Sequence, residues 1–186
     1  MYKKLYLFVL AILCLEIFGC SKNETKPVTE NKSKETFIYS ENITTSDIPD
    51  SPIKGFIGGK TIEIKYINFE TWRGSNDNVL NFSTNQPKQP CGVVLNDTAF
   101  SLTGLSKSFT KGDFIKSSFS TGVDGYIANY HTYKNDEIKK FSGAWNCALQ
   151  ITEMNDKTVK GKIAICFKDS LKSWVAGSFE AIRCNN

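Results

Sequence analysis

From Ile53 to the C-terminus, apolar and polar residues alternate in short segments that are separated by Gly, Asn and Asp. In 61–66 every second residue is apolar, which is the pattern of a strand with one buried face. Further strands are predicted at 79–83, 93–95, 100–105, 114–115, 126–133, 145–153, 158–167 and 174–184. The chain shows no long apolar stripe with a helical period. The pattern therefore predicts an all-β domain of about nine strands, an antiparallel β-sandwich or alternatively a β-barrel.

The last three predicted strands can be aligned with one another. Turns at 155–157 and 169–172 let one apolar face of each strand point the same way, so the chain is expected to end in an antiparallel meander. In this register Cys147 lies nearly opposite Ile165, and Cys184 lies near Thr158. The three core faces consist of Trp145, Leu149 and Ile151, of Ile163, Ile165 and Phe167, and of Val175, Phe179 and Ala181.

The N-terminus has a different pattern. Lys3 and Lys4 precede an uncharged run of 11 residues, 5–15, and a small residue follows at Gly19. This order is typical of a cleaved secretory signal. A transmembrane helix is not expected, because spanning the bilayer core takes about 20 apolar residues. Residues 1–19 are therefore predicted to be removed.

The sequence Ile17-Phe18-Gly19-Cys20 resembles the lipobox of bacterial lipoproteins. The resemblance implies a diacylglycerol thioether on Cys20, cleavage before this residue and acylation of the new amino terminus. Two or three acyl chains anchor a protein stably where one binds only marginally. Ser21 follows the lipidated cysteine in place of the Asp that usually marks inner-membrane retention in enteric bacteria. The protein is therefore expected in the bacterial cell envelope, anchored to the outer membrane by the lipid on Cys20.

Residues 20–50 are predicted to form a disordered tether, and residues 51–186 the β domain. The tether contains no Gly and few apolar residues among its many polar ones. Such a segment buries too little apolar surface to offset the entropy of ordering it. Its one apolar cluster, 36–39, is a candidate for docking on the edge of the domain.

The net charge of +4 comes from 23 Lys and Arg against 19 Asp and Glu. The positive charge belongs to the predicted domain, where the lysines are dispersed and the longest run is Lys139-Lys140. Dispersed lysines are typical of solvated strand faces and turns, so a nucleic-acid partner is not expected.

Four cysteines remain once Cys14 leaves with the signal and Cys20 takes lipid, and an even number in an exported chain indicates disulfides. Cys184 lies about 25 Å along the meander from the other two cysteines there, whereas a disulfide needs Cα atoms within about 7 Å. The prediction is Cys147 with Cys166 and Cys91 with Cys184. The first pair requires a bulge or register shift, because the two residues lie on opposite faces. The spacing of the four cysteines does not indicate a metal site.

Few residues are candidates for catalysis. His131 is the one imidazole and is predicted to be a surface or strand-edge histidine. The segment Gly58-Gly59-Lys60-Thr61 lacks the first glycine of a phosphate-binding loop and precedes a strand, so it is interpreted as a turn. Neither a catalytic residue nor a cofactor is predicted. Six aromatic residues are expected to lie in the core or on a sheet face, and the alternative is that they stack on a sugar or a partner. They are Trp72, Trp145, Trp174, Tyr126, Tyr130 and Tyr133.

The segments Ile53–Lys60, Pro90-Cys91, Val159–Ile163, Trp174–Ala181 and the final Cys184 resemble a family of small bacterial lipoproteins of unknown function. The resemblance implies a β-sandwich and a disulfide between the middle and the end of the chain. It supplies no catalytic residues.

A non-catalytic binding or interaction module on a membrane tether is therefore the functional hypothesis, with an unidentified protein or glycan partner. Two alternatives stay open. The protein would be an inhibitor of an envelope-attacking hydrolase, or a hydrolase that uses His131 as its base.

Lipidation can be tested at Cys20. Labelled fatty acid is expected to enter the wild-type protein but not the Cys20→Ala variant, because the thioether needs the thiol. Label on the variant, or residues 1–19 on the purified native chain, would contradict the prediction.

Overall fold

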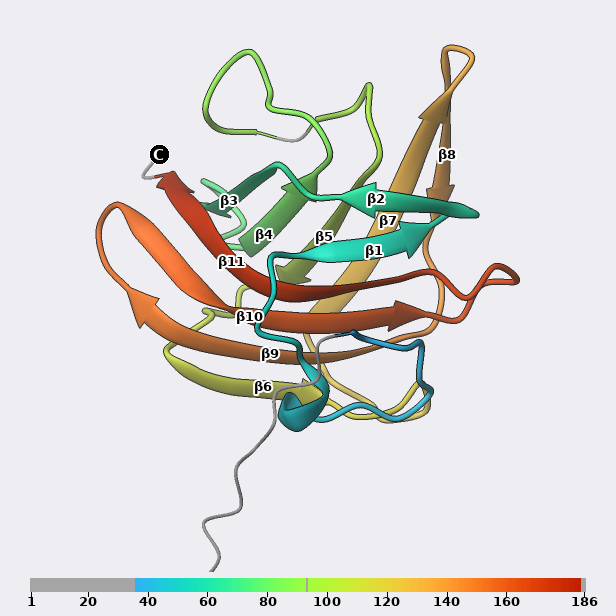
Figure 1. Ribbon diagram of the computed structural model, residues 1–186. Helices are drawn as coiled ribbons and strands as arrows, with labels where there is room; N and C mark the ends of the chain where they lie inside the picture. Colours follow the sequence, from blue (N-terminus) through green and yellow to red (C-terminus); the bar gives the residue numbers. More distant parts are fainter. Residues whose placement is uncertain (1–35, 93, 185–186) are drawn as a thin grey trace, which may run out of the picture. The chain divides into compact units, whose positions relative to one another are not determined.

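The computed structural model describes residues 36–92 and 94–184 (Figure 1). Apart from one 3-10 helix, η1 at Thr45–Asp47, the regular structure of these residues consists of β-strands. The all-β class predicted from the sequence is confirmed. The strands are β1 Lys54–Ile57, β2 Lys60–Glu63, β3 Tyr66–Thr71, β4 Asn78–Ser83, β5 Ala99–Gly104, β6 Gly112–Lys116, β7 Tyr126–Lys134, β8 Glu137–Phe141, β9 Trp145–Met154, β10 Thr158–Phe167 and β11 Trp174–Cys184.

The strands form one sheet in the order β6-β9-β10-β11-β3-β4-β5-β7-β8, which curls into a half-barrel (Figure 1). β11 joins its parts. It pairs with β10, with the β1–β2 hairpin through residues 174–176, and with β3 through residues 182–184. The β3–β11 pair is parallel, which the sequence did not indicate. These strands are far apart in the chain, so no tight turn forces them to run in opposite directions.

The hydrophobic core lies on the inner face of the curled sheet. Phe82 stacks on Phe100 with ring centroids 4.2 Å apart and meets Phe179 edge to face at 5.6 Å, so rings from β4, β5 and β11 connect the two sides of the curl. The predicted meander is confirmed, because β9, β10 and β11 pair in sequence order. All nine of its predicted core residues belong to this buried cluster.

The outer face of β9, β10 and β11 is covered by residues 36–50, called here the strap. Residues 40–50 were predicted to belong to a disordered tether, and that prediction is wrong. Residues 36–39 were the candidate for docking, and Phe37 does pack, on the outer face of the sheet. The strap residues Phe37, Ile43 and Ile48 are buried against the sheet. Ile43 and Ile48 are single apolar residues in a polar segment, with neither a helical nor a strand period, so no pattern indicated that they would pack. The strap approaches the sheet closely because the strands present mostly small side chains there, Ala148, Ala164, Cys166 and Ala176.

Gly177 lets the chain that follows the strap cross β11. Its φ of +144° is unfavourable for other residues, and a Cβ would lie 2.5 Å from the Ile53 Cα. The Ser178 amide donates to the Ser51 carbonyl across this contact at 2.8 Å. A side chain at position 177 would therefore push β1 away from β11.

The structure confirms one predicted disulfide and contradicts the other. Cys91 and Cys184 are bonded, whereas Cys147 and Cys166 are buried free thiols. The predicted register is correct, since Cys147 pairs with Ile165. The bulge lies at Lys160–Gly161, too early in β10 to bring both thiols to one face. Burial raises the pKa of both thiols, to about 12 for Cys166.

Two predicted strands differ from the structure. Of the predicted strand 61–66, residues 61–63 lie in β2 and Tyr66 begins β3, whereas 64 and 65 belong to neither. The described residues of 93–95 belong to a loop. β1, β8 and all of β3 after Tyr66 were not predicted. β8 has the sequence Glu-Ile-Lys-Lys-Phe and is almost fully exposed, so it lacks the apolar alternation of a half-buried strand.

The strap predicts a measurable contribution to stability. Ile43→Ala is expected to lower the free energy of unfolding by about 2 to 5 kcal/mol, because Ile43 is fully buried. Ile38→Ala is the control: this side chain is 80% exposed, and its removal should change stability by less than about 0.5 kcal/mol. Urea unfolding measures both, and equal small effects would show that the strap is not packed.

Candidate ligand-binding pocket

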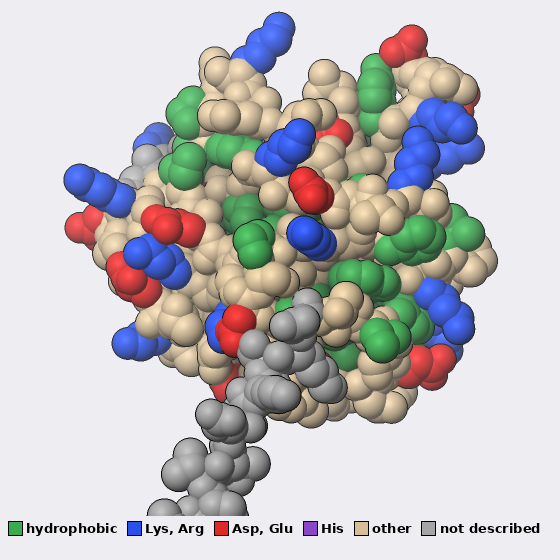
Figure 2. All heavy atoms as spheres, viewed as in Figure 1, with side chains coloured by type: hydrophobic (Ala, Val, Ile, Leu, Met, Phe, Trp, Pro, Cys, Tyr) green, Lys and Arg blue, Asp and Glu red, His purple; other side chains and the backbone are tan. Residues whose placement is uncertain are grey.

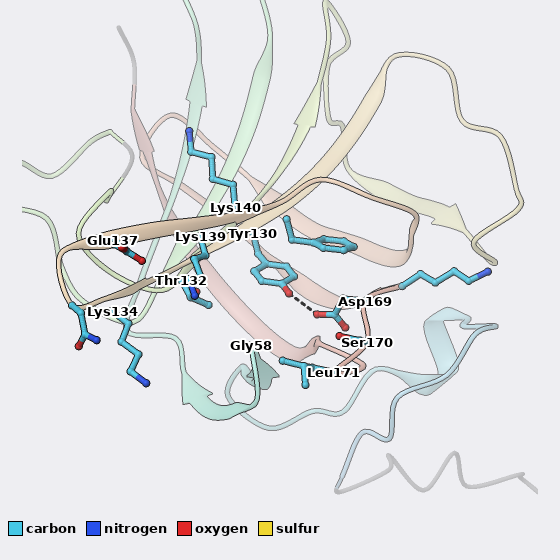
Figure 3. A pocket seen from close by; sticks show the side chains of 13 residues that line it. Gly58, Tyr130, Thr132, Lys134, Glu137, Lys139, Lys140, Asp169, Ser170 and Leu171 are labelled. Atoms are coloured by element: carbon cyan, nitrogen blue, oxygen red, sulfur yellow. Dashed lines mark hydrogen bonds between the residues drawn. The ribbon is translucent and has the colours of Figure 1, made fainter.

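A cavity of about 700 Å³, called here the hairpin pocket, opens between the β7–β8 hairpin and the turn that joins β10 to β11 (Figure 3). The pairing of β7 with β8 places three residue pairs on the side of the hairpin that faces the pocket. They change from aromatic at the floor to charged at the tip. In that order they are Tyr130 with Phe141, Thr132 with Lys139, and Lys134 with Glu137.

The opposite wall is held by Asp169. Its Oδ2 accepts hydrogen bonds from the Tyr130 hydroxyl and the Ser173 hydroxyl, each at 2.5 Å, and its Oδ1 accepts from the Ser173 amide at 2.8 Å. The Ser173 hydroxyl in turn accepts from the Gly58 amide at 3.1 Å. The β1–β2 turn, β7 and the β10–β11 turn are thereby fixed to one another.

Gly58 has to be glycine in this arrangement. Its φ is +59°, and a Cβ would lie 2.8 Å from Cγ2 of Thr132 on the hairpin. The segment predicted to be a glycine turn between two strands does form the β1–β2 turn, and it touches the pocket through Gly58.

The network determines the protonation of both partners. Burial raises the pKa of Tyr130 to about 12, and the hydrogen bond to Asp169 adds to the increase. Burial alone would raise the pKa of Asp169, but the hydrogen bonds from Ser173 and Tyr130 stabilise the carboxylate and lower the pKa overall. At neutral pH the pair is therefore a protonated phenol that donates to an ionised carboxylate.

Lysines surround the mouth of the pocket. Lys134, Lys139 and Lys168 line it, and in the part of the chain that the structure describes none of them forms a salt bridge. Lys140 also borders it, but its side chain points away in Figure 3. Lys side chains gather beside the β7–β8 hairpin in Figure 2, with acidic side chains at the hairpin tip.

His131 does not reach this pocket. It lies on the opposite face of β7 from Tyr130, where it is buried and its Nε2 is 2.9 Å from the Val94 carbonyl oxygen. The prediction of a surface or strand-edge position is wrong. Burial lowers the pKa of His131, although the bond to Val94 opposes the change. Within residues 36–92 and 94–184, neither a carboxylate nor a hydroxyl forms a hydrogen bond with its ring.

The surroundings of His131 explain its burial. The outer face of β3, β4, β5 and β7 carries one row of polar side chains, Asn68, Asn81, Ser101 and Asn129. The loop between β4 and β5 covers part of this row, and Asn68 donates to the carbonyl of Gly92 in that loop at 2.9 Å. The cavity left beneath the loop, about 40 Å³, is far smaller than ligand pockets, which span about 300 to 1,000 Å³.

Among the six aromatic residues considered above, Tyr130 is the one that lines the hairpin pocket. Trp145 is buried in the core and Tyr126 packs against it, as expected. Trp174 packs beneath the strap. Trp72 and Tyr133 are partly exposed elsewhere, and their polar atoms donate to Glu70 and Asp136.

Some predicted features lie outside the described residues, among them the signal at 1–19 and Cys20. In the described ranges no three His, Cys, Asp or Glu side chains come together as metal ligands. No helix there is long and apolar enough to cross a membrane.

The chain matches no protein-family model, no curated protein and no solved structure. The pocket is therefore interpreted from its own geometry. Asp169 and Ser173 were not singled out from the sequence. A turn at 169–172 was predicted, but its contact with β7 depends on the curl of the sheet, which local pattern does not encode.

The network predicts a pH-dependent effect of Tyr130→Phe. At pH 7 the free energy of unfolding should fall by about 1.5 to 3 kcal/mol, because the variant loses a hydrogen bond to a charged group. The contribution of a carboxylate with a lowered pKa is complete above its ordinary pKa of about 3.9 and is lost as the pH falls through the folded value.

The difference between wild type and variant should therefore shrink at about pH 2. Tyr133→Phe is the matched control, since its hydroxyl donates to the exposed Asp136. Urea unfolding at both pH values measures the effect. A loss that does not change with pH would contradict the proposed charge state of Asp169.

Proposed function

We propose that this chain is a lipid-anchored, non-catalytic binding protein of the bacterial envelope, and that the hairpin pocket is its binding site. The observation that carries the proposal is the network behind the pocket. Tyr130, Asp169, Ser173 and Gly58 fix three separate segments through hydrogen bonds of 2.5 to 3.1 Å. A pocket whose base is rigid before a ligand arrives loses less entropy on binding.

The walls also suit binding better than catalysis. The Tyr130 hydroxyl keeps its proton at neutral pH, because its pKa is raised to about 12. Asp169 already accepts three hydrogen bonds, so it is poorly placed to act as a general base. His131, the candidate base of the hydrolase alternative, lies on the other face of β7 and is bonded to a backbone carbonyl. The anchor at Cys20 rests on the sequence of the N-terminal region.

Occupancy of the pocket can be tested in intact cells. A photo-crosslinking amino acid in place of Thr132, inside the pocket, should form light-dependent adducts with an envelope component. The same amino acid in place of Thr110 is the control, because Thr110 is exposed and precedes β6, near the opposite end of the β9–β10 pair. Adducts from Thr132 alone are expected. Equal adducts from both positions, or none from Thr132, would contradict the proposal.

A further inference from the structure

We propose that the hairpin pocket binds an acidic oligosaccharide, that is, a glycan whose sugars carry carboxylate or phosphate groups. This inference rests on the proposed function of the pocket and specifies its ligand. Three properties of the walls support it: their charge, their aromatic floor and their polar side chains.

The charge of the lining favours an anion. Lys134, Lys139 and Lys168 contribute three positive charges, against the carboxylates of Glu137 and Asp169. The Asp169 carboxylate is directed at protein donors by its bonds with Tyr130 and Ser173, so Glu137 at the tip is the carboxylate left to face a ligand. Lys134 and Lys139 are also free of salt bridges within the described residues, so a ligand anion would not have to displace a carboxylate from them. Lys168 forms no salt bridge there either, but its Nζ lies over the Phe119 ring, 6.0 Å from the ring centroid.

The floor of the pocket is aromatic. Phe141 stacks on Tyr130 with ring centroids 5.1 Å apart, and Phe167 meets both rings edge to face at 6.0 and 5.0 Å. Phe141 remains partly exposed, and Leu171 at the rim is half exposed. The exposed parts of these two side chains offer apolar contacts to the C–H groups of a sugar ring.

Polar side chains stand between the floor and the lysines. Thr132, Asn135 and Ser170 line the cavity and offer donors and acceptors for sugar hydroxyls. A volume of about 700 Å³ falls within the range of pockets that hold small organic ligands. Because the cations are lysines, they act as point charges and do not impose the bidentate geometry of arginine. Recognition of acidic groups in several orientations is expected, with an affinity that falls as salt increases.

The test uses the full-length lipidated protein in micelles of an uncharged detergent, with binding measured by isothermal titration calorimetry. The probe is trigalacturonic acid, and its trimethyl ester is the matched neutral ligand with the same sugar rings. Hexaglutamate tests the alternative of an acidic peptide. Lys139→Gln combined with Lys134→Gln removes two pocket charges. Lys157→Gln is the single-charge control, because Lys157 is exposed in the β9–β10 turn, at the other end of β10.

The acid is expected to bind at least about tenfold more tightly than the ester, and the double variant to weaken the acid by a similar factor. The Lys157 variant should bind like wild type, and about 0.5 M salt should weaken binding of the acid. Equal binding of acid and ester, preferential binding of hexaglutamate, or an unchanged affinity of the double variant would overturn the proposal. If no probe binds although the residue at position 132 forms crosslinks in cells, the ligand class is wrong and the pocket's function stands.

Discussion

β10 is buried on both of its faces, and this double burial governs how the core, the strap and the pocket floor are placed. Residues 163–167 are all buried. Ile163, Ile165 and Phe167 point into the core, whereas Ala164 and Cys166 lie on the outer face. The inner face of β10 is covered because the sheet curls over it. The outer face is covered by the strap. Small outer residues make this possible because they let the strap backbone lie close to the sheet.

The same strand carries the pocket. Phe167 is the last residue of β10, and its backbone amide donates to the Ser173 carbonyl at 2.9 Å across the turn that contains Asp169. Its ring meets Tyr130 edge to face at 5.0 Å. Its carbonyl accepts a hydrogen bond from the Tyr39 hydroxyl of the strap. One residue therefore contacts the strap on one side and the pocket floor on the other, so the position of the pocket floor depends on the packing of β10.

The local pattern of apolar and polar residues was sufficient to predict the parts of the fold whose contacts join residues near each other in the sequence. The meander and the turn at Gly58 follow from alternation and turn chemistry, and the meander register also identified Cys91 and Cys184 as partners by exclusion. The disulfide between Cys147 and Cys166 was predicted although strand alternation places the two residues on opposite faces. In the structure they do lie on opposite faces, and both thiols are free.

The strap and the Asp169 network could not be predicted in this way. Ile43 and Ile48 are isolated apolar residues in a polar segment, and their burial depends on an alanine-rich face more than 100 residues later in the chain. The Tyr130–Asp169 contact joins β7 to a turn 39 residues away and exists only because the sheet curls. No periodic pattern of residues in the sequence indicates a single long-range hydrogen bond of this kind.

The two free thiols report directly on whether β10 is buried between the core and the strap. Cys147 faces the core and Cys166 faces the strap. Pulsed alkylation followed by mass spectrometry should find both unreactive in the native protein. In an Ile43→Asn variant, which places an amide beneath the strap, Cys166 should react at least about tenfold faster while Cys147 stays protected. Rapid alkylation of Cys166 in the wild type, or equal protection of both thiols in a folded variant, would contradict the account.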